Sequence, residues 1–95
     1  MRETAVAFLG RIRYWDEERG AGLAVVDVPA ACVPALGGLK QQRVRGSIGS
    51  VDFVSNVAPA GGGRLALSVS KAMMAASHAG VGMDVDIVIT GIGRD

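Results

Sequence analysis

The chain has 95 residues, of which 49% are apolar and 20% are charged, and its formal net charge is +1. Leu, Ile, Val and Phe account for 26 residues, more than the roughly 20% below which disorder is expected. No apolar run approaches the ~20 residues of a transmembrane helix. Glu3 and Thr4 stand where the apolar part of a signal segment would begin. We therefore expect one cytoplasmic, globular domain over residues 1–95.

Apolar and polar residues alternate over residues 4–15, which predicts a strand with Gly10 as a bulge or bend. Residues 16–20 form a polar turn. Residues 22–28 are almost continuously apolar, which indicates a central strand that is buried on both faces.

A short helix is expected to begin at Pro29, where the missing N–H of proline is tolerated. Pro34 lies too far inside this helix to be accommodated easily. Gly37 and Gly38 supply the left-handed residue that ends it. Cys32, the only cysteine, excludes an intrachain disulfide and favours a small buried side chain over a reactive thiol.

Alternation resumes in strands over residues 43–48 and 51–57, which a hairpin turn at residues 49–50 connects. Residues 59–63 are rich in glycine and are expected to be the most flexible stretch. A further strand follows over residues 64–69.

Ser70 is a suitable N-cap for an Ala- and Met-rich helix over residues 71–79, which Gly80 or Gly82 would close. The last strand covers residues 84–89.

The second half of the chain repeats the first with an offset of 41 residues. Both halves contain a glycine turn, an apolar strand, a short helix, a glycine and an alternating strand. The matching pairs are Gly22 and Gly63, Val28 and Val69, Ala31 and Ala72, Ala35 and Ala76, and Val44 and Val85. Neither unit can cover its own apolar face. We therefore expect a mainly β fold, a small closed or double-split β-barrel with two short helices at its ends and a pseudo-twofold axis. Chance similarity between Gly-, Ala- and Val-rich segments is the alternative.

No catalytic or metal-binding constellation is evident. His78 is the only histidine, and its place near the end of the second predicted helix favours a capping role over catalysis. One histidine and scattered carboxylates do not make a zinc site. The acidic residues 16–18 fit a solvated turn better than a calcium site. We expect neither enzymatic activity nor a metal or other cofactor.

Asp84 and Asp86 share one strand face, as the carboxylates of a catalytic pair would. Arg43 and Arg45 occupy the repeat-equivalent positions. If the two strands are neighbours, we expect these arginines to pair with the two aspartates, and we prefer this structural role.

Basic side chains at alternate positions also suggest a phosphate-binding surface. Arg11, Arg13, Arg43 and Arg45, with Lys71, are the candidates for binding nucleic acid. The net charge of +1 and the lack of interleaved aromatic residues argue for a solvated, partly salt-bridged surface instead.

A small-anion site is a weaker hypothesis for the segment formed by Gly61, Gly62, Gly63 and Arg64. Its backbone N–H groups could form an anion-binding concavity, to which Arg64 would add a charged fork. The segment lacks the lysine of a P-loop and does not match the dinucleotide-binding fingerprint, so a mobile turn is preferred.

Scattered segments together resemble a known family. They are Phe8, residues 24–29, Leu36-Gly37, residues 44–49 followed by Phe53, residues 61–67, residues 69–72, residues 80–82 and Val85. This ordered set resembles a bacterial family of domains of unknown function, number 1905, which occurs alone or fused to the YdeI/OmpD-associated bacteriocin-protection domain. The chain departs from that pattern at Met74, where the family often has arginine, and at Met83, where it has aspartate.

The resemblance implies a double-split β-barrel like that of the AbrB/MazE transcription regulators, and no established activity. In AbrB-like proteins two chains build one barrel, and residues 63–89 resemble one such unit. If both halves are such units, one chain completes the barrel and the dimer that presents DNA-binding arginines is not required.

The leading hypothesis is a non-catalytic binding or interaction module of unknown protein or nucleic-acid partner, not associated with membranes, and either monomeric or homodimeric. The alternatives are a nucleic-acid-binding protein of the AbrB type and a small-anion-binding protein.

Overall fold

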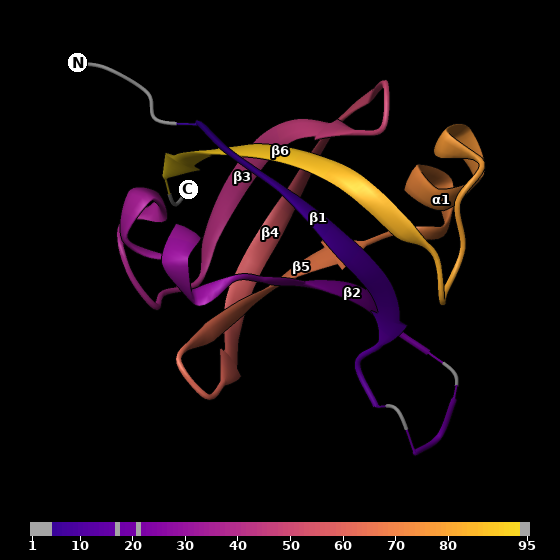
Figure 1. The fold of residues 1–95 in the computed structure, drawn as a ribbon, viewed down its shortest axis with the longest axis horizontal. Helices are drawn as coiled ribbons and strands as arrows, with labels where there is room; N and C mark the ends of the chain where they lie inside the picture. The colour runs from indigo at the N-terminus through magenta and orange to yellow at the C-terminus, as the bar shows by residue number, and fades with distance from the viewer. Residues whose placement is uncertain (1–4, 17, 21, 94–95) are drawn as a thin grey trace.

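The computed structural model describes residues 5–16, 18–20 and 22–93, so Thr4 and Glu17 of the predicted strand and turn lie outside it. Six antiparallel strands close into a barrel (Figure 1). Their order around it is β1-β2-β5-β4-β3-β6, and β6 pairs again with β1. The strands are β1 (Ala5–Tyr14), β2 (Ala24–Val28), β3 (Gln42–Ile48), β4 (Val51–Gly61), β5 (Arg64–Val69) and β6 (Asp84–Gly93). The predicted mainly β barrel is confirmed.

The core consists of the side chains that point into the barrel at every second strand position. β-Branched residues suit these positions because their stiff side chains pack well on a pleated surface. Burying one such side chain fully contributes about 1.5–3 kcal/mol. The residues without any exposed surface are Ile12, Val26, Val28, Val44, Ile48, Val57, Leu65, Leu67, Ile87 and Ile89.

Strand β2 is buried on both faces, as its apolar sequence predicts. Val26 points into the barrel, whereas Val25 points outward and is nevertheless only 1% exposed. Val25 lies between Arg13 of β1 and Ser68 of β5 in the sheet. The outward side of this wall is therefore covered as well as the inward side.

The strand register confirms the internal repeat. On one wall Val26 of β2 faces Leu67 of β5, and on the opposite wall Ser47 of β3 faces Val88 of β6. The members of each pair are 41 residues apart, the offset found in the sequence. Residues that are equivalent in a twofold repeat face one another only at the axis, so the pseudo-twofold axis passes through these two pairs.

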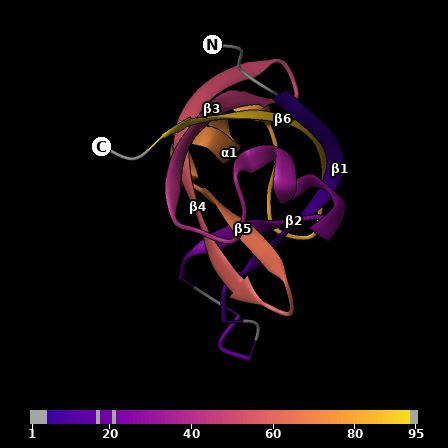
Figure 2. The same ribbon diagram turned by 90° about the vertical axis from the view of Figure 1, so that its left-hand side faces the viewer.

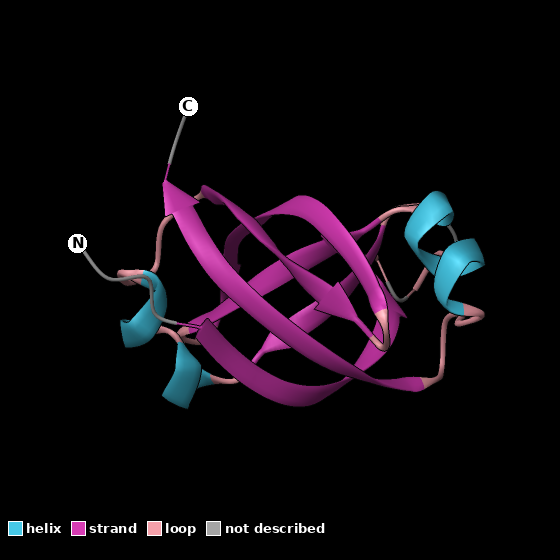
Figure 3. Ribbon diagram, turned by 90° about the horizontal axis from the view of Figure 1, so that it is seen from above, coloured by secondary structure: helices cyan, strands magenta, loops and turns pink. Residues whose placement is uncertain are grey.

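Each half of the chain contributes one long strand that divides its pairing between two neighbours. β1 pairs with β6 up to Arg11 and with β2 from Ile12 onward. β4 pairs with β3 up to Val57 and with β5 from Val57 onward. The helical segments lie at the two ends of the barrel (Figure 3), and Figure 2 shows the ring of strands with the first helical segment in front.

The first helical segment is split by Pro34 into two 3₁₀ turns, η1 (Ala30–Cys32) and η2 (Pro34–Leu36). Proline cannot donate a backbone hydrogen bond, so it is accommodated at the first position of the second turn. Gly37 ends the segment with a φ of 90°, as predicted. Cys32 packs half-buried against the core.

The second helical segment, α1 (Lys71–Ser77), begins at Ser70, whose Oγ accepts a 3.1 Å hydrogen bond from the N–H of Met73. The expectation that Gly80 or Gly82 closes this helix is wrong. His78 does so in the left-handed conformation, with a φ of 56°, and its N–H bonds back to carbonyls of the last turn. None of the helices within the described residues is long and apolar enough to cross a membrane.

Two further segments differ in detail from the expectation. β1 pairs regularly with β6 on both sides of Gly10, so no bulge interrupts that ladder. A Cβ at Gly10 would collide with the side chain of Val26, which explains the glycine by close packing. β4 continues through Pro59 to Gly61, where a flexible stretch was expected. An irregularity in its register between these two residues accommodates the proline, which cannot donate to a regular ladder.

Gly46 is expected to be essential for the close packing of β3 against β6, since a Cβ at this position would overlap the backbone carbonyl of Val88 on β6. We predict that Gly46→Ala lowers the free energy of unfolding by roughly 2–3 kcal/mol, because rigid backbone must move. Gly80→Ala is the matched control, since a Cβ at that position would meet no atom within 4 Å and the φ of Gly80 is not positive. Urea unfolding of both variants measures this, and equal stabilities would contradict it.

Candidate functional site

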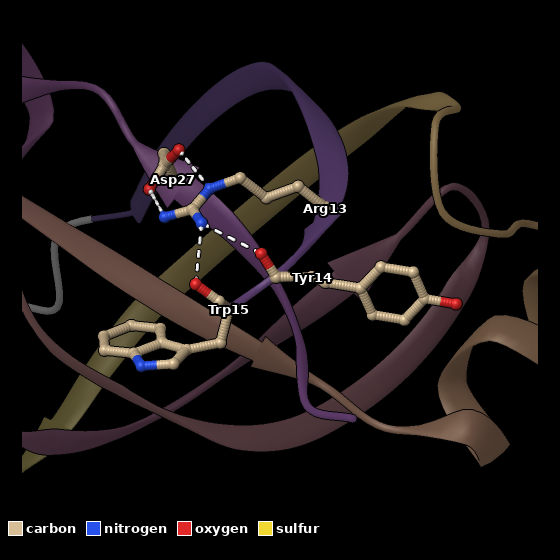
Figure 4. A network of polar contacts seen from close by, with 4 residues as sticks. All are labelled: Arg13, Tyr14, Trp15 and Asp27. Carbon is tan, nitrogen blue, oxygen red and sulfur yellow. Dashed lines mark hydrogen bonds and ion pairs between the residues drawn. The ribbon is translucent and has the colours of Figure 1, made fainter. Parts of the chain in front are cut away.

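Arg13 on β1 forms a half-buried ion pair with Asp27 on β2 (Figure 4). Its Nε and Nη2 bond to the two carboxylate oxygens at 2.8 and 2.9 Å, and Nη1 donates to the carbonyls of Tyr14 and Trp15. The hydrogen bonds from Arg13 lower the pKa of Asp27 below its usual value. Partial burial of the carboxylate opposes this shift, and the positive charges of Arg13 and Arg64 add to it.

Arg11, two residues earlier on the same face of β1, forms an exposed ion pair with Asp84 on β6. Nε lies 2.9 Å from Oδ1 and Nη2 lies 3.4 Å from Oδ2. Hydrogen bonding to Arg11 lowers the pKa of Asp84. Two of the five residues proposed for nucleic-acid binding are therefore engaged with carboxylates of the same chain.

The expected pairing of Arg43 and Arg45 with Asp84 and Asp86 is wrong, although β3 and β6 are neighbours. In the sheet Arg45 faces Thr90, and Arg43 faces Gly93. The reason is the pseudo-twofold axis at Ser47 and Val88, beyond which equivalent residues diverge in opposite directions. Both aspartates consequently lie next to β1, where Asp84 faces Arg11 and Asp86 faces Leu9.

The basic residues do not form one continuous stripe. Arg45 is aligned through Thr90 with Ala5, the first described residue of β1. Arg11 lies six residues farther along that strand, or about 20 Å at 3.3 Å per residue. Lys71 lies on α1, at one end of the barrel.

The glycine-rich segment lies at the tip of the β4–β5 hairpin. Gly61 faces Arg64 across it, and Gly62 and Gly63 form the turn with φ values of 64° and 75°. Positive φ at both central residues is the requirement of a tight two-residue hairpin turn, so hairpin geometry accounts for these two glycines. Anion binding at this exposed tip stays a prediction.

A groove of about 610 Å³ lies across β3, β4 and β6, and it was not anticipated from the sequence. Gly46 and Phe53 face each other in the sheet, and both occupy positions that point into the barrel. No side chain therefore rises outward from these two positions, and they form the floor of the groove. The neighbouring positions on both strands point outward and form its rim. The rim residues are Arg45, Ser47, Asp52 and Val54, with Thr90 of β6 beside them.

The groove combines several kinds of contact within a small area. Arg45 and Asp52 carry opposite charges, Ser47 and Thr90 supply hydroxyl groups, and Val54 is 55% exposed. The one sequence signal for this groove is Gly46, which stands between two residues that point outward. The sequence does not show that β4 and β6 lie alongside it, because that follows from the strand register.

Comparison with known proteins identifies a family without assigning a function. A family model described as "Domain of unknown function (DUF1905)" matches residues 8–89, which is most of the chain. Searches of curated proteins and of solved structures find no significant match.

The Arg13–Asp27 pair is expected to make stability depend on pH. A carboxylate whose pKa is lower in the folded state stabilises the fold above its unfolded pKa of about 3.9, and this contribution is lost as the pH falls through the folded value. Asp27→Asn should cost about 1–2 kcal/mol at pH 7. The difference from the unmodified protein should begin to shrink as the pH falls below about 4, and it should vanish only below the lower pKa that Asp27 has in the folded state. Urea unfolding at several pH values measures this.

Asp84→Asn is the control, because its ion pair is exposed and contributes little. A loss of stability that is equal for both variants, or independent of pH for Asp27→Asn, would contradict the prediction.

Proposed function

The chain belongs to the DUF1905 family of domains of unknown function, and we propose that it is a non-catalytic binding module whose groove across β3, β4 and β6 holds a short segment of a partner protein. The observation that carries this proposal is the arrangement of Arg45, Asp52 and Val54 around the floor formed by Gly46 and Phe53.

The size of the groove suits several side chains of a short peptide segment. Its volume of about 610 Å³ falls within the roughly 300–1,000 Å³ of small-ligand sites. It runs over an open barrel wall, which favours a segment that continues beyond the groove over an enclosed metabolite. Residues 44–49 and Phe53 belong to the part of the chain that resembles the family.

The rim indicates what such a segment would carry. Arg45 already makes a contact within the chain. An acidic side chain of the partner would share its guanidinium, a group that can bind carboxylates through two parallel hydrogen bonds. An apolar residue next to it would cover Val54, and the hydroxyls of Ser47 and Thr90 would bond to the segment's backbone or polar groups. A segment that contains an acidic residue beside an apolar one therefore fits best.

The nucleic-acid alternative receives less support from the same observations. Arg11 and Arg13 are bound to Asp84 and Asp27, and Arg45 lies about 20 Å from Arg11 along the strands. Phosphate contacts would require breaking these ion pairs or spanning separated charges. The barrel also closes within one chain, so no dimer is needed to complete it.

Binding in the groove can be detected without knowing the natural partner. We expect capped tripeptides with a central Glu flanked by Leu or Phe to shift the backbone amide signals of Arg45, Phe53 and Thr90 in NMR spectra of ¹⁵N-labelled protein. Arg45→Gln should weaken binding about tenfold, the loss expected for a charge-assisted hydrogen bond. Arg19→Gln, in the β1–β2 turn, is the matched control. Shifts confined to other surfaces, or binding unaffected by Arg45→Gln, would refute the assignment.

Duplex DNA distinguishes the two function classes. At ~50 mM salt we expect no saturable binding of a 20-base-pair duplex in a fluorescence anisotropy titration. Binding whose affinity falls steeply with salt would instead indicate several phosphate contacts and favour the nucleic-acid role.

A further inference from the structure

A second, smaller pocket of about 210 Å³ lies at the end of the barrel that α1 covers. It is separate from the groove on the barrel wall, and no residue lines both. Its walls come from the end of β1, the start of β2, the end of β5, the first turn of α1 and the turn before β6. The lining residues are Tyr14, Gly22, Leu23, Ala24, Val69, Ser70, Lys71, Met74 and Val81.

Most of the lining is apolar, and part of it is exposed to solvent. Leu23 is 54% exposed and Val81 is 39% exposed, and they come from segments of the chain that are far apart in the sequence. Met74 lies one helical turn after Lys71 and is half-buried against the core. Tyr14 points away from the Arg13–Asp27 pair in Figure 4 and contributes to the same lining. Large exposed apolar side chains beside a cavity favour a ligand with an apolar body.

Among the lining residues that the structure describes, Lys71 carries the one formal charge. Its side chain is exposed, and within the described part of the chain it makes no ion pair. The other polar groups of the lining are hydroxyls, and the Oγ of Ser70 already accepts the N–H of Met73. An apolar pocket with one ammonium group at its edge is complementary to a molecule with an apolar body and one negative charge.

From this complementarity we propose that the pocket binds a small monocarboxylate whose carboxylate lies against Lys71 and whose apolar part is covered by Leu23, Met74 and Val81. The size is consistent, because an apolar cavity of about 150 Å³ accepts benzene. The additional volume here suffices for a carboxylate group. The inference does not depend on the groove or on the proposed function.

Benzoate is the test probe, with benzamide as its neutral analogue of equal shape. In NMR titrations of ¹⁵N-labelled protein we expect benzoate to shift the amide signals of Gly22, Val69 and Lys71 in a saturable manner. Lys71→Gln should weaken benzoate binding about tenfold and leave benzamide binding unchanged, since only the charged hydrogen bond is lost. Lys40→Gln, an exposed lysine at the other end of the barrel, is the matched control and should bind benzoate normally.

Leu23→Ser separates the apolar contribution from the charge, and it should weaken benzoate and benzamide to the same extent. Spectra of the free variants establish that each remains folded, which is expected because both substituted side chains are exposed. The proposal is overturned if benzoate shows no saturable shifts up to ~20 mM. Equal benzoate affinity in Lys71→Gln and the unmodified protein, or shifts confined to the groove on β3, β4 and β6, would overturn it as well.

Discussion

Closure of the barrel depends on β1 changing its partner from β6 to β2 within a single strand. The change falls between Arg11, the last residue in register with β6, and Ile12, the first in register with β2. Backbone hydrogen bonds to two neighbours remove the exposed edges that open sheets must otherwise protect. Two ion pairs flank this point, since Arg11 reaches Asp84 of β6 and Arg13 reaches Asp27 of β2. Arginines that resemble a phosphate-binding stripe in the sequence thus link β1 to both of its neighbours.

The pseudo-twofold axis explains why equivalent sequence positions have acquired different surroundings. Lys71 at the start of α1 corresponds to Ala30 at the start of η1, and Met74 corresponds to Val33. One end of the barrel is covered by α1, which lines a pocket and places the ammonium group of Lys71 at its edge. At the other end Pro34 breaks the helical segment into two 3₁₀ turns. A repeated architecture with diverged ends can therefore carry a binding site at one end without duplicating it at the other.

The sequence predicted what depends on local pattern. Alternation placed the strands, the apolar run around Val25 indicated burial on both faces, and Ser70 was identified as a cap. The sequence could not predict contacts that depend on the register between strands. Asp84 pairs with Arg11, 73 residues away, because β6 lies between β3 and β1. Similarly, the groove at Gly46 requires β4 and β6 to be aligned beside β3.

The same distinction bears on function. A basic residue on a strand has the same sequence signature whether it joins strands or contacts a ligand, so residue type does not decide its role. Arg13 is half-buried and bonded to Asp27 and to two carbonyls, an arrangement that ties its guanidinium to the fold. Lys71, in contrast, lies at the edge of a pocket that is also lined by the exposed apolar side chains of Leu23 and Val81. The ion pairs of Arg11 and Arg13 occupy the β1 face of the barrel, and the groove on β3, β4 and β6 and the pocket at the α1 end are the two places where we propose recognition.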